Sequence, residues 1–310
     1  MKTYIAIDGG TTNTRISLVK NREVVDTVKL SMGARTCIEN GDMLKTEIKR
    51  TIETLLKNHS ENDVTCVLAS GMITSEFGLC SLPHIETPAG INELHSSMHR
   101  TVLEDISPIP FVFIRGVKVP AESFENADVM RGEETELMGL IKLEYGKCVY
   151  VLPGSHSKII RTDESGKIVD FSTMLTGEMI YSLSQHTILK DAVDLSVREL
   201  NKEYLLRGFD YCREDGINKA LFKTRILKNS FGCSKKETYS FFLGSVLSQE
   251  IEQIIKSDVG TVVLGGKAEI KTPMAEILKE RDTKKIVLLD ENEVARSTAL
   301  GAVRIFEGSY

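Results

Sequence analysis

The 310-residue sequence has no tryptophan, only seven prolines and six cysteines, and no long unbroken run of apolar residues. No apolar run reaches the roughly 18 residues that suggest a membrane-spanning helix, which argues against a membrane partner. The N-terminus opens with a predicted strand, where a secretory signal would carry a basic segment followed by an apolar one. We therefore expect a cytoplasmic protein. We also expect two domains, because single hydrophobic cores stop growing near this chain length.

The cysteines form no dense framework and no CxxC pair, which predicts reduced thiols rather than disulfides. They are Cys37, Cys66, Cys80, Cys148, Cys212 and Cys233. The formal net charge at pH 7 is -5 and the sequence has no basic stripe, so nucleic acid is not an expected partner. Attraction for an anionic substrate must then come from loops and a few local cations.

The sequence does contain a glycine turn directly after its first predicted strand. A short apolar run ends at Asp8 and is followed by Gly9 and Gly10, by a group of hydroxyl side chains, and by a second strand predicted over 15–20. Glycines allow a close approach to a polyanion, and successive N–H groups in such a turn form an anion-binding concavity. A carboxylate at the strand end can hold Mg²⁺, directly or through water. The pattern predicts a phosphate-binding hairpin and makes ATP the first hypothesis, while an ordinary tight β-hairpin is the alternative.

A second copy of this layout begins at residue 148. It has an apolar strand, a turn of glycine and hydroxyl residues and a second strand, and in both copies a third strand follows, predicted over 23–30 and 167–173. The copies align Gly10 with Gly154, Thr11 with Ser155 and Asp8 with Leu152. Internal repeats reveal architecture, and this one predicts two similar domains that face one cleft and offer one hairpin each to the phosphates. Only the first copy keeps a carboxylate, as expected for a single metal site; the alternative is a pair of unrelated hairpins.

Predicted helices and strands alternate along the rest of the chain, which indicates an α/β fold. Apolar periodicity and β-branched runs predict the helices 42–57, 131–145, 176–189, 217–227, 236–257 and 291–306 and the strands 64–69, 111–117, 261–264 and 286–289. Pro108 and Pro110 are expected to break the chain before the second of these strands. We expect an N-terminal domain over 1–145 and a C-terminal domain over 146–290, with a last helix over 291–310 packed back on the first domain.

Two of the predicted helices carry a face of small residues. On one helix the face consists of Gly132, Thr135 and Gly139, and on the last helix of Ala295, Thr298, Ala299 and Ala302. Glycine inside a helix costs about 0.5–1 kcal/mol relative to alanine, so its presence needs a reason. A close crossing of two helices that act as a hinge between the domains is one reason, and tight packing within a single domain is the other.

The order of these features resembles the actin/hexokinase/Hsp70-like ATPase superfamily, which implies two similar ribonuclease-H-like domains with an interdomain cleft. Within that superfamily, four segments resemble the 2-dehydro-3-deoxygalactonokinase family. They are residues 130–137 (MRGEETEL), 152–158 (LPGSHSK), 175–179 (LTGEM) and the stretch from Ser70-Gly71-Met72 to Ser75 and Gly78. The resemblance implies that ATP, with Mg²⁺, phosphorylates the terminal hydroxyl of a six-carbon 2-keto-3-deoxy sugar acid. The implied reaction converts 2-dehydro-3-deoxy-D-galactonate to its 6-phosphate in galactonate degradation.

The resemblance also implies roles for individual residues. Glu133 is the best candidate for the carboxylate that accepts the hydroxyl proton, with Glu134 as its fallback, although without the resemblance Glu133 would be interpreted as an acid that stabilises the helix dipole. Asp8 is expected to hold Mg²⁺ through water. The residues expected around the phosphates and the nucleotide are Gly10, Thr11, Thr12, Asn13, Gly154, Ser155, His156, Lys158, Thr176, Gly265 and Gly266. The residues expected at the sugar acid are Gly71, Met72, Ser75 and Arg131.

Some of these residues have an open alternative. Lys158 is either a phosphate-binding cation or a lysine on an edge strand. Arg131 either binds the carboxylate of the sugar acid, which its fork-shaped guanidinium suits, or pairs with a helix-end acid. His156 is expected to position the turn as a hydrogen-bond donor rather than to act as a catalytic histidine.

Similar kinases tend to have tryptophan where this chain has Gly9, Leu79 and Ile159, so the preferred sugar acid stays open. Two other functions remain at this point. One is a kinase of another sugar or of an amino sugar with the same fold, and the other is a non-catalytic ATP-binding regulator. A regulator would be expected to carry an added DNA-binding segment, and none is visible in the sequence. The oligomeric state is open too, a homodimer included.

Overall fold

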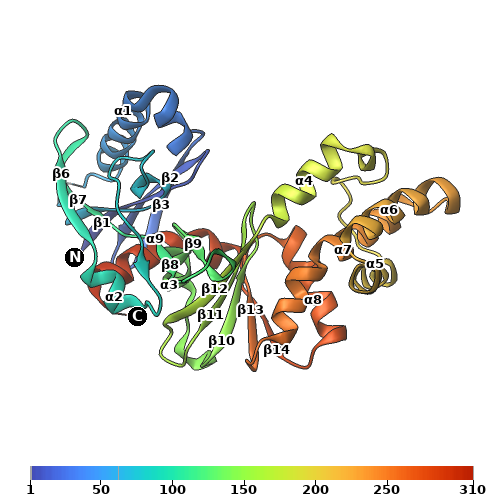
Figure 1. The fold of residues 1–310 in the computed structure, drawn as a ribbon. Helices are drawn as coiled ribbons and strands as arrows, with labels where there is room; N and C mark the ends of the chain where they lie inside the picture. The colour runs from blue at the N-terminus through green and yellow to red at the C-terminus, as the bar shows by residue number, and fades with distance from the viewer. Residues whose placement is uncertain (1, 62, 310) are drawn as a thin grey trace. The chain divides into compact units, whose positions relative to one another are not determined.

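The computed structural model describes residues 2–61 and 63–309, apart from the side chains of residues 37–41. The chain forms two compact units whose segments alternate along the sequence (Figure 1). Unit 1 comprises Met1–Gly146, Asp163–Asp170 and Asn292–Tyr310, and unit 2 comprises Lys147–Thr162 and Phe171–Glu291.

Unit 1 is built around a six-stranded mixed sheet with the strand order β3-β2-β1-β4-β7-β6. Its strands are β1 (Thr3–Gly9), β2 (Thr14–Lys20), β3 (Glu23–Leu30), β4 (Cys66–Gly71), β6 (His99–Leu103) and β7 (Ser107–Phe113). β1, β2 and β3 form an antiparallel meander, whereas β4 pairs in parallel with β1 and with β7. A small second sheet contains β5 (Ile85–Glu86), β8 (Val117–Val119) and β9 (Asp128–Met130). The parallel pairing places Asp8 beside Ser70 and Gly9 beside Gly71 at one end of the main sheet.

Helices cover both faces of this main sheet. The helices of unit 1 are α1 (Ala34–Asn58), α2 (Ile91–Ser96), α3 (Glu133–Leu140) and α9 (Glu291–Glu307), of which Glu291 is counted with unit 2. The apolar side of α1 packs against β1 at Ile5 and Ile7. On the other face, the ring of Phe306 in α9 packs edge-on against the ring of Tyr4, with 5.6 Å between the two ring centroids. Because side chains alternate between the two faces of a strand, Asp8 belongs to the face of Tyr4.

Unit 2 repeats the sheet of unit 1. Its strand order, β12-β11-β10-β13-β14, matches β3-β2-β1-β4-β7, with the same antiparallel hairpin and the same parallel neighbours. The strands are β10 (Cys148–Leu152), β11 (Ser157–Thr162), β12 (Ile168–Met174, whose first residues are counted with unit 1), β13 (Thr261–Leu264) and β14 (Lys285–Leu288). The internal repeat predicted from the glycine turns is therefore confirmed in the sheets, and the fold class is α/β.

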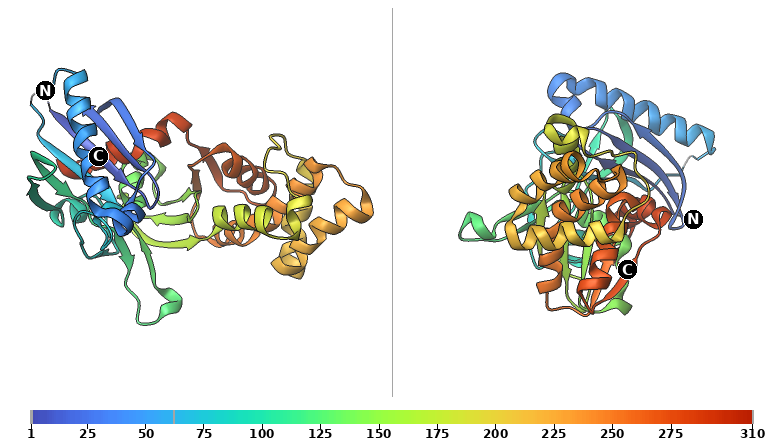
Figure 2. Two further views of the ribbon diagram at one scale, coloured as in Figure 1. Left: turned by 90° about the horizontal axis from the view of Figure 1, so that it is seen from above. Right: turned by 90° about the vertical axis from the view of Figure 1, so that its right-hand side faces the viewer.

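The helices of unit 2 pack on one another and on its sheet. They are α4 (Thr176–His186), α5 (Lys202–Asp215), α6 (Ile217–Phe231), α7 (Lys235–Lys256) and α8 (Ala268–Arg281). Figure 1 and the two further views of Figure 2 show α5, α6 and α7, in gold to orange, gathered together. α7 is buried along most of its length and contributes Phe242, Leu247 and Ile251 to the core. It crosses α5 closely, because a Cβ on Gly208 or Gly244 would come within 2.0 Å of a backbone oxygen of the other helix.

Several helices differ from the sequence-based expectation. The apolar pattern does not predict α5 or α8, and α8 contains Pro273, which ordinarily breaks a helix. α1 begins at Ala34, earlier than its apolar stripe indicates, and the helix expected over 131–145 is the shorter α3 followed by a 3₁₀ turn at Leu143–Tyr145. Further 3₁₀ turns lie at Met72–Thr74, Phe124–Asn126 and Ile188–Asp191.

The strand expected over 111–117 is displaced in the structure. The strand is Ser107–Phe113, and it contains Pro108 and Pro110, which were expected to precede it. Proline lacks an N–H and fits a sheet only where the ladder does not need that donor. β4 pairs only with the last three residues of β7, and the register with β6 shifts beside the prolines, so both prolines are tolerated.

Helices α3 and α9 approach each other closely within unit 1. A Cβ on Gly139 would lie 2.0 Å from the carbonyl oxygen of Ser297, and one on Gly301 would lie 1.9 Å from that of Thr135. The two helices do cross closely, but α9 makes the crossing through Ser297 and Gly301, which the sequence pattern did not include. The face expected on α9, namely Ala295, Thr298, Ala299 and Ala302, instead lines a small pocket with residues of β1 and β2. The hinge role of these helices stays a prediction.

Two expectations from composition can be compared with the structure. In the part of the chain that is described, no helix is long and apolar enough to span a membrane. The five cysteines whose side chains are described, which exclude Cys37, are all free thiols.

We expect Gly301→Ala to destabilise the protein, because the added Cβ would overlap the carbonyl oxygen of Thr135. Overpacking of this kind typically costs about 1–3 kcal/mol, so the melting temperature should fall by several degrees. The matched control is Gly260→Ala, whose Cβ would meet no atom within 4 Å. Thermal unfolding of both variants beside the wild type tests the crossing, and three equal melting temperatures would contradict it.

Candidate active site

The first glycine turn joins β1 to β2, and the start of α1 packs against it. The N–H groups of Ala34 and Arg35 donate to the carbonyl oxygens of Gly10 and Thr11, each at 3.0 Å. A Cβ on Gly33 would lie 2.4 Å from the Gly10 oxygen, so the helix can approach the turn only through glycine. The three side chains that follow Gly10 are exposed. The turn therefore directs carbonyl oxygens toward α1 and polar side chains toward solvent.

The second glycine turn, between β10 and β11, is held in the same way by the start of α4. The N–H groups of Gly177 and Glu178 donate to the carbonyl oxygens of Gly154 and Ser155 at 3.1 and 3.3 Å. A Cβ on Gly177 would lie 2.3 Å from the Gly154 oxygen. His156 is half-exposed, and its Nε2 lies 3.0 Å from Oε1 of Glu178. This contact fits the positioning role expected of His156.

A further matched pair of glycines packs against the two turns. Gly71 and Gly266 have φ values of 81° and 73°, a region that favours glycine. A Cβ on Gly71 would lie 2.5 Å from the oxygen of Gly9, and one on Gly266 would lie 2.8 Å from the oxygen of Pro153. Gly71 and Gly266 thus occupy equivalent places in the repeat, and the backbone itself requires glycine at both.

Acidic side chains gather at the end of β1 and the start of α3. Asp8 keeps 28% of its side-chain surface, and its Oδ2 lies 3.6 Å from Nη1 of Arg15. Burial raises the pKa of Asp8, with a contribution from the charge of Glu133, while Arg15 opposes the rise. Burial, with the charges of Asp8 and Glu133, also raises the pKa of Glu136 to about 8. The carboxylates repel one another, so this part of unit 1 favours a bound cation.

The structure distinguishes Glu133 from Glu134. α3 begins after Gly132, whose φ is 111°. Glu134 is fully buried: the N–H of Gly132 donates to its two oxygens at 2.7 and 3.0 Å, and the hydroxyl of Thr135 donates at 3.0 Å. Burial raises the pKa of Glu134 to about 8. Glu133 keeps part of its surface and accepts a hydrogen bond from the N–H of Arg131 at 3.1 Å. Of the two carboxylates, Glu133 is the one that a bound molecule can reach.

Arg131 holds the loop that follows β4. Its Nη1 donates to the carbonyl and hydroxyl oxygens of Thr74 at 2.8 and 2.6 Å, and its Nη2 donates to the carbonyl oxygen of Leu82 at 2.9 Å. Nη2 also lies 3.4 Å from Nδ1 of His84, whose pKa burial and the charge of Arg131 lower to about 4. The expected role of Arg131 as a fork for the sugar acid stays a prediction. The charge of Glu134, an acid at the start of α3, opposes the lowering of the pKa of Arg131 by burial. Arg131 fixes the loop 72–82.

The other residues expected at the sugar acid lie in this loop or, in the case of Gly71, at the end of β4 directly before it. Gly71 is buried, Met72 is half-buried, and the hydroxyl of Ser75 donates to the carbonyl oxygen of Met72 at 2.6 Å. Gly71 also lies next to the start of α3, since a Cβ on Gly132 would be 3.1 Å from its Cα. The structure therefore brings the loop and the Glu133 region together within unit 1.

Two residues expected near the phosphates are buried within unit 2. β11 lies between β12 and β10, so the edge-strand interpretation of Lys158 is wrong. Lys158 is 4% exposed, and its Nζ donates to the hydroxyl of Thr173 at 2.9 Å. Thr176 is also 4% exposed, and its hydroxyl donates to Oε2 of Glu250 at 2.7 Å. Both side chains contact other protein groups rather than solvent.

Four residues of these arrangements were missed in the sequence, namely Gly33, Gly177, Glu136 and Glu250. A signal for the two glycines exists, because each lies three residues after the end of the third strand of its copy, at Leu30 and Met174. Gly177 and Glu136 also lie within the segments 175–179 and 130–137 that carry the family resemblance, although neither was singled out. No comparable signal marks Glu250, since long-range packing decides what surrounds it.

The residues near Asp8 fit a magnesium ion. Among the described side chains, no group of three or more His, Cys, Asp or Glu is arranged to hold a metal by itself. Mg²⁺ needs no such cage, because it keeps several waters and commonly binds through one or two carboxylates plus substrate phosphates. A partly exposed carboxylate in an excess of negative charge, as at Asp8, has the donor chemistry that such an ion requires.

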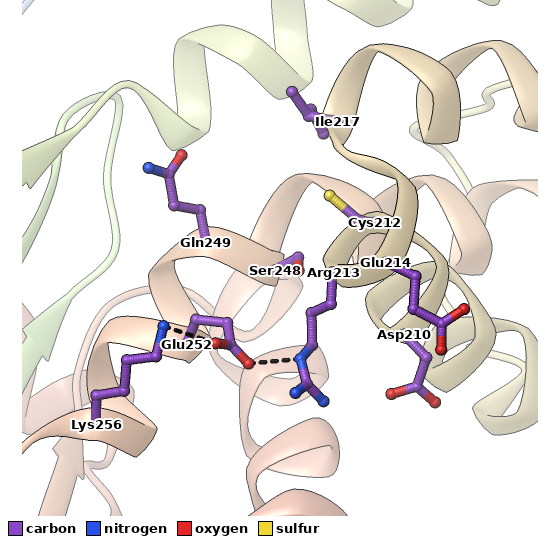
Figure 3. Close-up of a pocket in the computed structure, with 9 residues that line it drawn as sticks. All are labelled: Asp210, Cys212, Arg213, Glu214, Ile217, Ser248, Gln249, Glu252 and Lys256. Atoms are coloured by element: carbon purple, nitrogen blue, oxygen red, sulfur yellow. Dashed lines mark ion pairs between the residues drawn. The ribbon is translucent and has the colours of Figure 1, made fainter.

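Unit 2 also contains a cavity of about 510 Å³, lined from α5, α7 and the start of α6 (Figure 3). Its cations Arg213 and Lys256 both pair with Glu252, at 2.6 and 3.1 Å. The cavity contains none of the residues that the sequence predicts for the site. The lining also contains the acids Asp210 and Glu214, so its carboxylates outnumber its cations and it offers no net positive charge to a polyanion.

Comparison with known proteins identifies relatives along most of the chain. A family model described as 2-keto-3-deoxy-galactonokinase matches residues 8–301. A 2-dehydro-3-deoxygalactonokinase of Escherichia coli (strain K12) is 28% identical over 249 residues, which cover 79% of this chain and 77% of that protein.

Solved structures establish the fold. A crystal structure from Sinorhizobium meliloti, of a protein provisionally named 2-dehydro-3-deoxygalactonokinase, matches with a TM-score of 0.79 at 24% identity and covers 97% of this chain and 98% of that one. The activator of 2-hydroxyisocaproyl-CoA dehydratase from Clostridium difficile, solved with bound ADPNP, matches with a TM-score of 0.51 at 13% identity, over 99% of this chain and 95% of that one. These likenesses confirm the actin-like ATPase fold. Because the family model spans most of the sequence, the chain belongs to the 2-keto-3-deoxy-galactonokinase family and is a kinase.

Proposed function

We propose that this kinase transfers the γ-phosphoryl group of ATP to the terminal hydroxyl of 2-dehydro-3-deoxy-D-galactonate, giving the 6-phosphate and ADP. One observation carries the proposal. At the start of α3, Glu133 is accessible and its charge acts on Asp8, whereas Glu134 is hydrogen-bonded to the backbone N–H of Gly132. The family and the Escherichia coli relative support the choice of substrate.

Glu133 is the proposed base. In the transfer, the hydroxyl oxygen bonds to the γ-phosphorus, the bond from that phosphorus to the bridging oxygen of ADP breaks, and the hydroxyl proton passes to the carboxylate of Glu133. Phosphoryl transfer needs little covalent work from a protein, so positioning and charge stabilisation dominate. Glu134 is proposed to act structurally, because its two oxygens hold the N–H of Gly132 and so fix the helix start that carries Glu133.

The glycine turns are the proposed phosphate-binding elements. In each turn the carbonyl oxygens are engaged by the following helix, which supports a role of the turn's N–H groups and side chains in binding an anion. Asp8 would hold Mg²⁺ through water, and the ion would neutralise charge on the phosphates. The buried contacts of Lys158 and Thr176 support positioning roles for these two residues rather than direct contacts with the nucleotide.

The loop 72–82 is the proposed sugar acid subsite, and Arg131 is its support. Three hydrogen bonds of one guanidinium, to Thr74 and Leu82, fix this loop beside the helix that carries Glu133. The proposed compartment is the cytoplasm, which the free thiols of the described cysteines support.

The first prediction concerns the acceptor. A coupled assay of ADP release should show turnover with 2-dehydro-3-deoxy-D-galactonate and little with neutral hexoses or N-acetyl hexosamines, because the family to which the chain belongs is named for a sugar acid acceptor. Phosphorylation at the terminal hydroxyl can be confirmed by phosphorus NMR of the product. ATP turnover that no sugar acid changes would contradict the proposal, and a preference for an amino sugar would replace the substrate.

The second prediction concerns the base. Glu133→Gln should lower kcat by about 10²- to 10⁴-fold, the usual contribution of a positioned base, while the Kd of a non-hydrolysable ATP analogue stays the same. Glu144→Gln, which changes an exposed acid of the following 3₁₀ turn, is the matched control and should behave as wild type. If Glu134→Gln lost turnover and Glu133→Gln kept it, the two roles would have to be exchanged.

The third prediction concerns the second turn. A Cβ on Gly154 would meet only the carbonyl oxygen of His156, at 3.7 Å, so Gly154→Ala should leave the melting temperature unchanged. The new methyl group would stand where the turn is proposed to approach the phosphates, and steric hindrance of this size should raise the KM for ATP at least about tenfold. Gly260→Ala again serves as the control, and an unchanged KM in Gly154→Ala would remove the turn from the nucleotide site.

A further inference from the structure

Unit 2 contains a buried carboxylate that the proposed reaction does not use. Glu250 of α7 is 1% exposed, and its Oε2 accepts a hydrogen bond at 2.7 Å from the hydroxyl of Thr176, the first residue of α4. The carboxyl of Glu250 also lies near Ser157, the first residue of β11, which is fully buried. The hydroxyl of Ser157 lowers the pKa of Glu250, against the effect of burial. Groups from three elements therefore converge behind the second glycine turn.

The start of α4 touches the whole of that turn. The N–H groups of Gly177 and Glu178 donate to the oxygens of Gly154 and Ser155, and the carboxylate of Glu178 contacts His156. Each of these bonds requires the first residues of α4 to stay at one place. The hydroxyl bond from Thr176, which precedes these donors directly in the chain, ties that helix start to α7.

We propose that Glu250 is a positioning residue for nucleotide binding, which fixes the start of α4 through Thr176 and thereby fixes the second glycine turn. The proposal rests on the proposed function, because it takes this turn to bind the phosphates of ATP. It assigns a role to a side chain that lies beneath the turn, on a helix far along the chain from it.

The environment of Glu250 shows what this role requires. Burial raises the pKa of Glu250, which favours the neutral carboxyl. Within the described structure, Oε1 of Glu250 and Oγ of Ser157 have no hydrogen-bond partner of normal geometry, although both are buried. A neutral amide of the same shape can accept the bond from Thr176 and offer an N–H to Ser157. The role therefore depends on the shape and the hydrogen bond of the side chain, not on a negative charge.

The experiment measures the Kd of a non-hydrolysable ATP analogue by calorimetry, and the KM values for ATP and for the sugar acid, on the full-length protein. Thr176→Val and Glu250→Ala remove the bond, whereas Thr176→Ser and Glu250→Gln keep it. The matched control is Thr238→Val, which removes a buried hydroxyl bond to the carbonyl oxygen of Ala192 elsewhere on α7. Melting temperatures of all variants are measured in parallel.

Loss of one buried hydrogen bond at a positioning contact should weaken binding about tenfold. We expect Thr176→Val and Glu250→Ala to raise the Kd of the analogue and the KM for ATP by about that factor, with the KM for the sugar acid unchanged. Thr176→Ser and Glu250→Gln should restore wild-type values, and Thr238→Val should lower the melting temperature alone.

The proposal is overturned if Thr176→Val changes only the melting temperature, as the control does, or if Glu250→Gln is as damaging as Glu250→Ala. Should Glu250→Ala fail to fold, Thr176→Val decides the matter alone. If the wild-type protein binds the analogue but phosphorylates no sugar acid, the proposed function is wrong. The effect of Glu250 on nucleotide binding is then still decided by the Kd values of the same variants.

Discussion

The contact on which the site depends is the approach of a helix start to a glycine turn, made once in each unit. At Gly33 and at Gly177 the two backbones come so close that a single Cβ would collide with a carbonyl oxygen. The first N–H groups of the helix then satisfy the inner carbonyl oxygens of the turn. A turn that is bound in this way keeps its shape when no ligand is present, which reduces the ordering cost of binding a phosphate.

The two units have similar backbones around their glycine turns but differ in charge there. Unit 1 collects Asp8, Glu133 and Glu136 around one end of the sheet, where burial, together with their mutual repulsion, raises the pKa of Asp8 and of Glu136. At the position equivalent to Asp8, unit 2 has apolar Leu152. Its carboxylate Glu250 is buried and bonded to Thr176, at the start of the helix that packs against the second turn. One backbone design thus carries an acidic face in the first unit and an apolar residue at the equivalent place in the second.

The sequence predicts this backbone better than it predicts the contacts of the side chains. Gly10 and Gly154 could be aligned because both follow an apolar strand, and the strand order of the two sheets confirms the repeat. Helix α8 was missed because Pro273 interrupts a pattern that packing nevertheless sustains. Arg131 could not be assigned, since its partners Thr74 and Leu82 lie far from it in the sequence. A burial pattern and a turn are local properties, whereas the partner of a guanidinium is decided by the whole fold.

The division of the chain has a consequence for how the protein is made. Unit 1 takes its first residues from the beginning of the chain and its helix α9 from the end, where Gly301 packs against Thr135. A ribosome therefore releases the last piece of unit 1 only after all of unit 2 has emerged. Because domains tend to fold as they leave the ribosome, the unit that is begun first is completed last, and its sheet must wait with the face of Tyr4 uncovered until α9 arrives. No single cut in the chain could yield either unit whole.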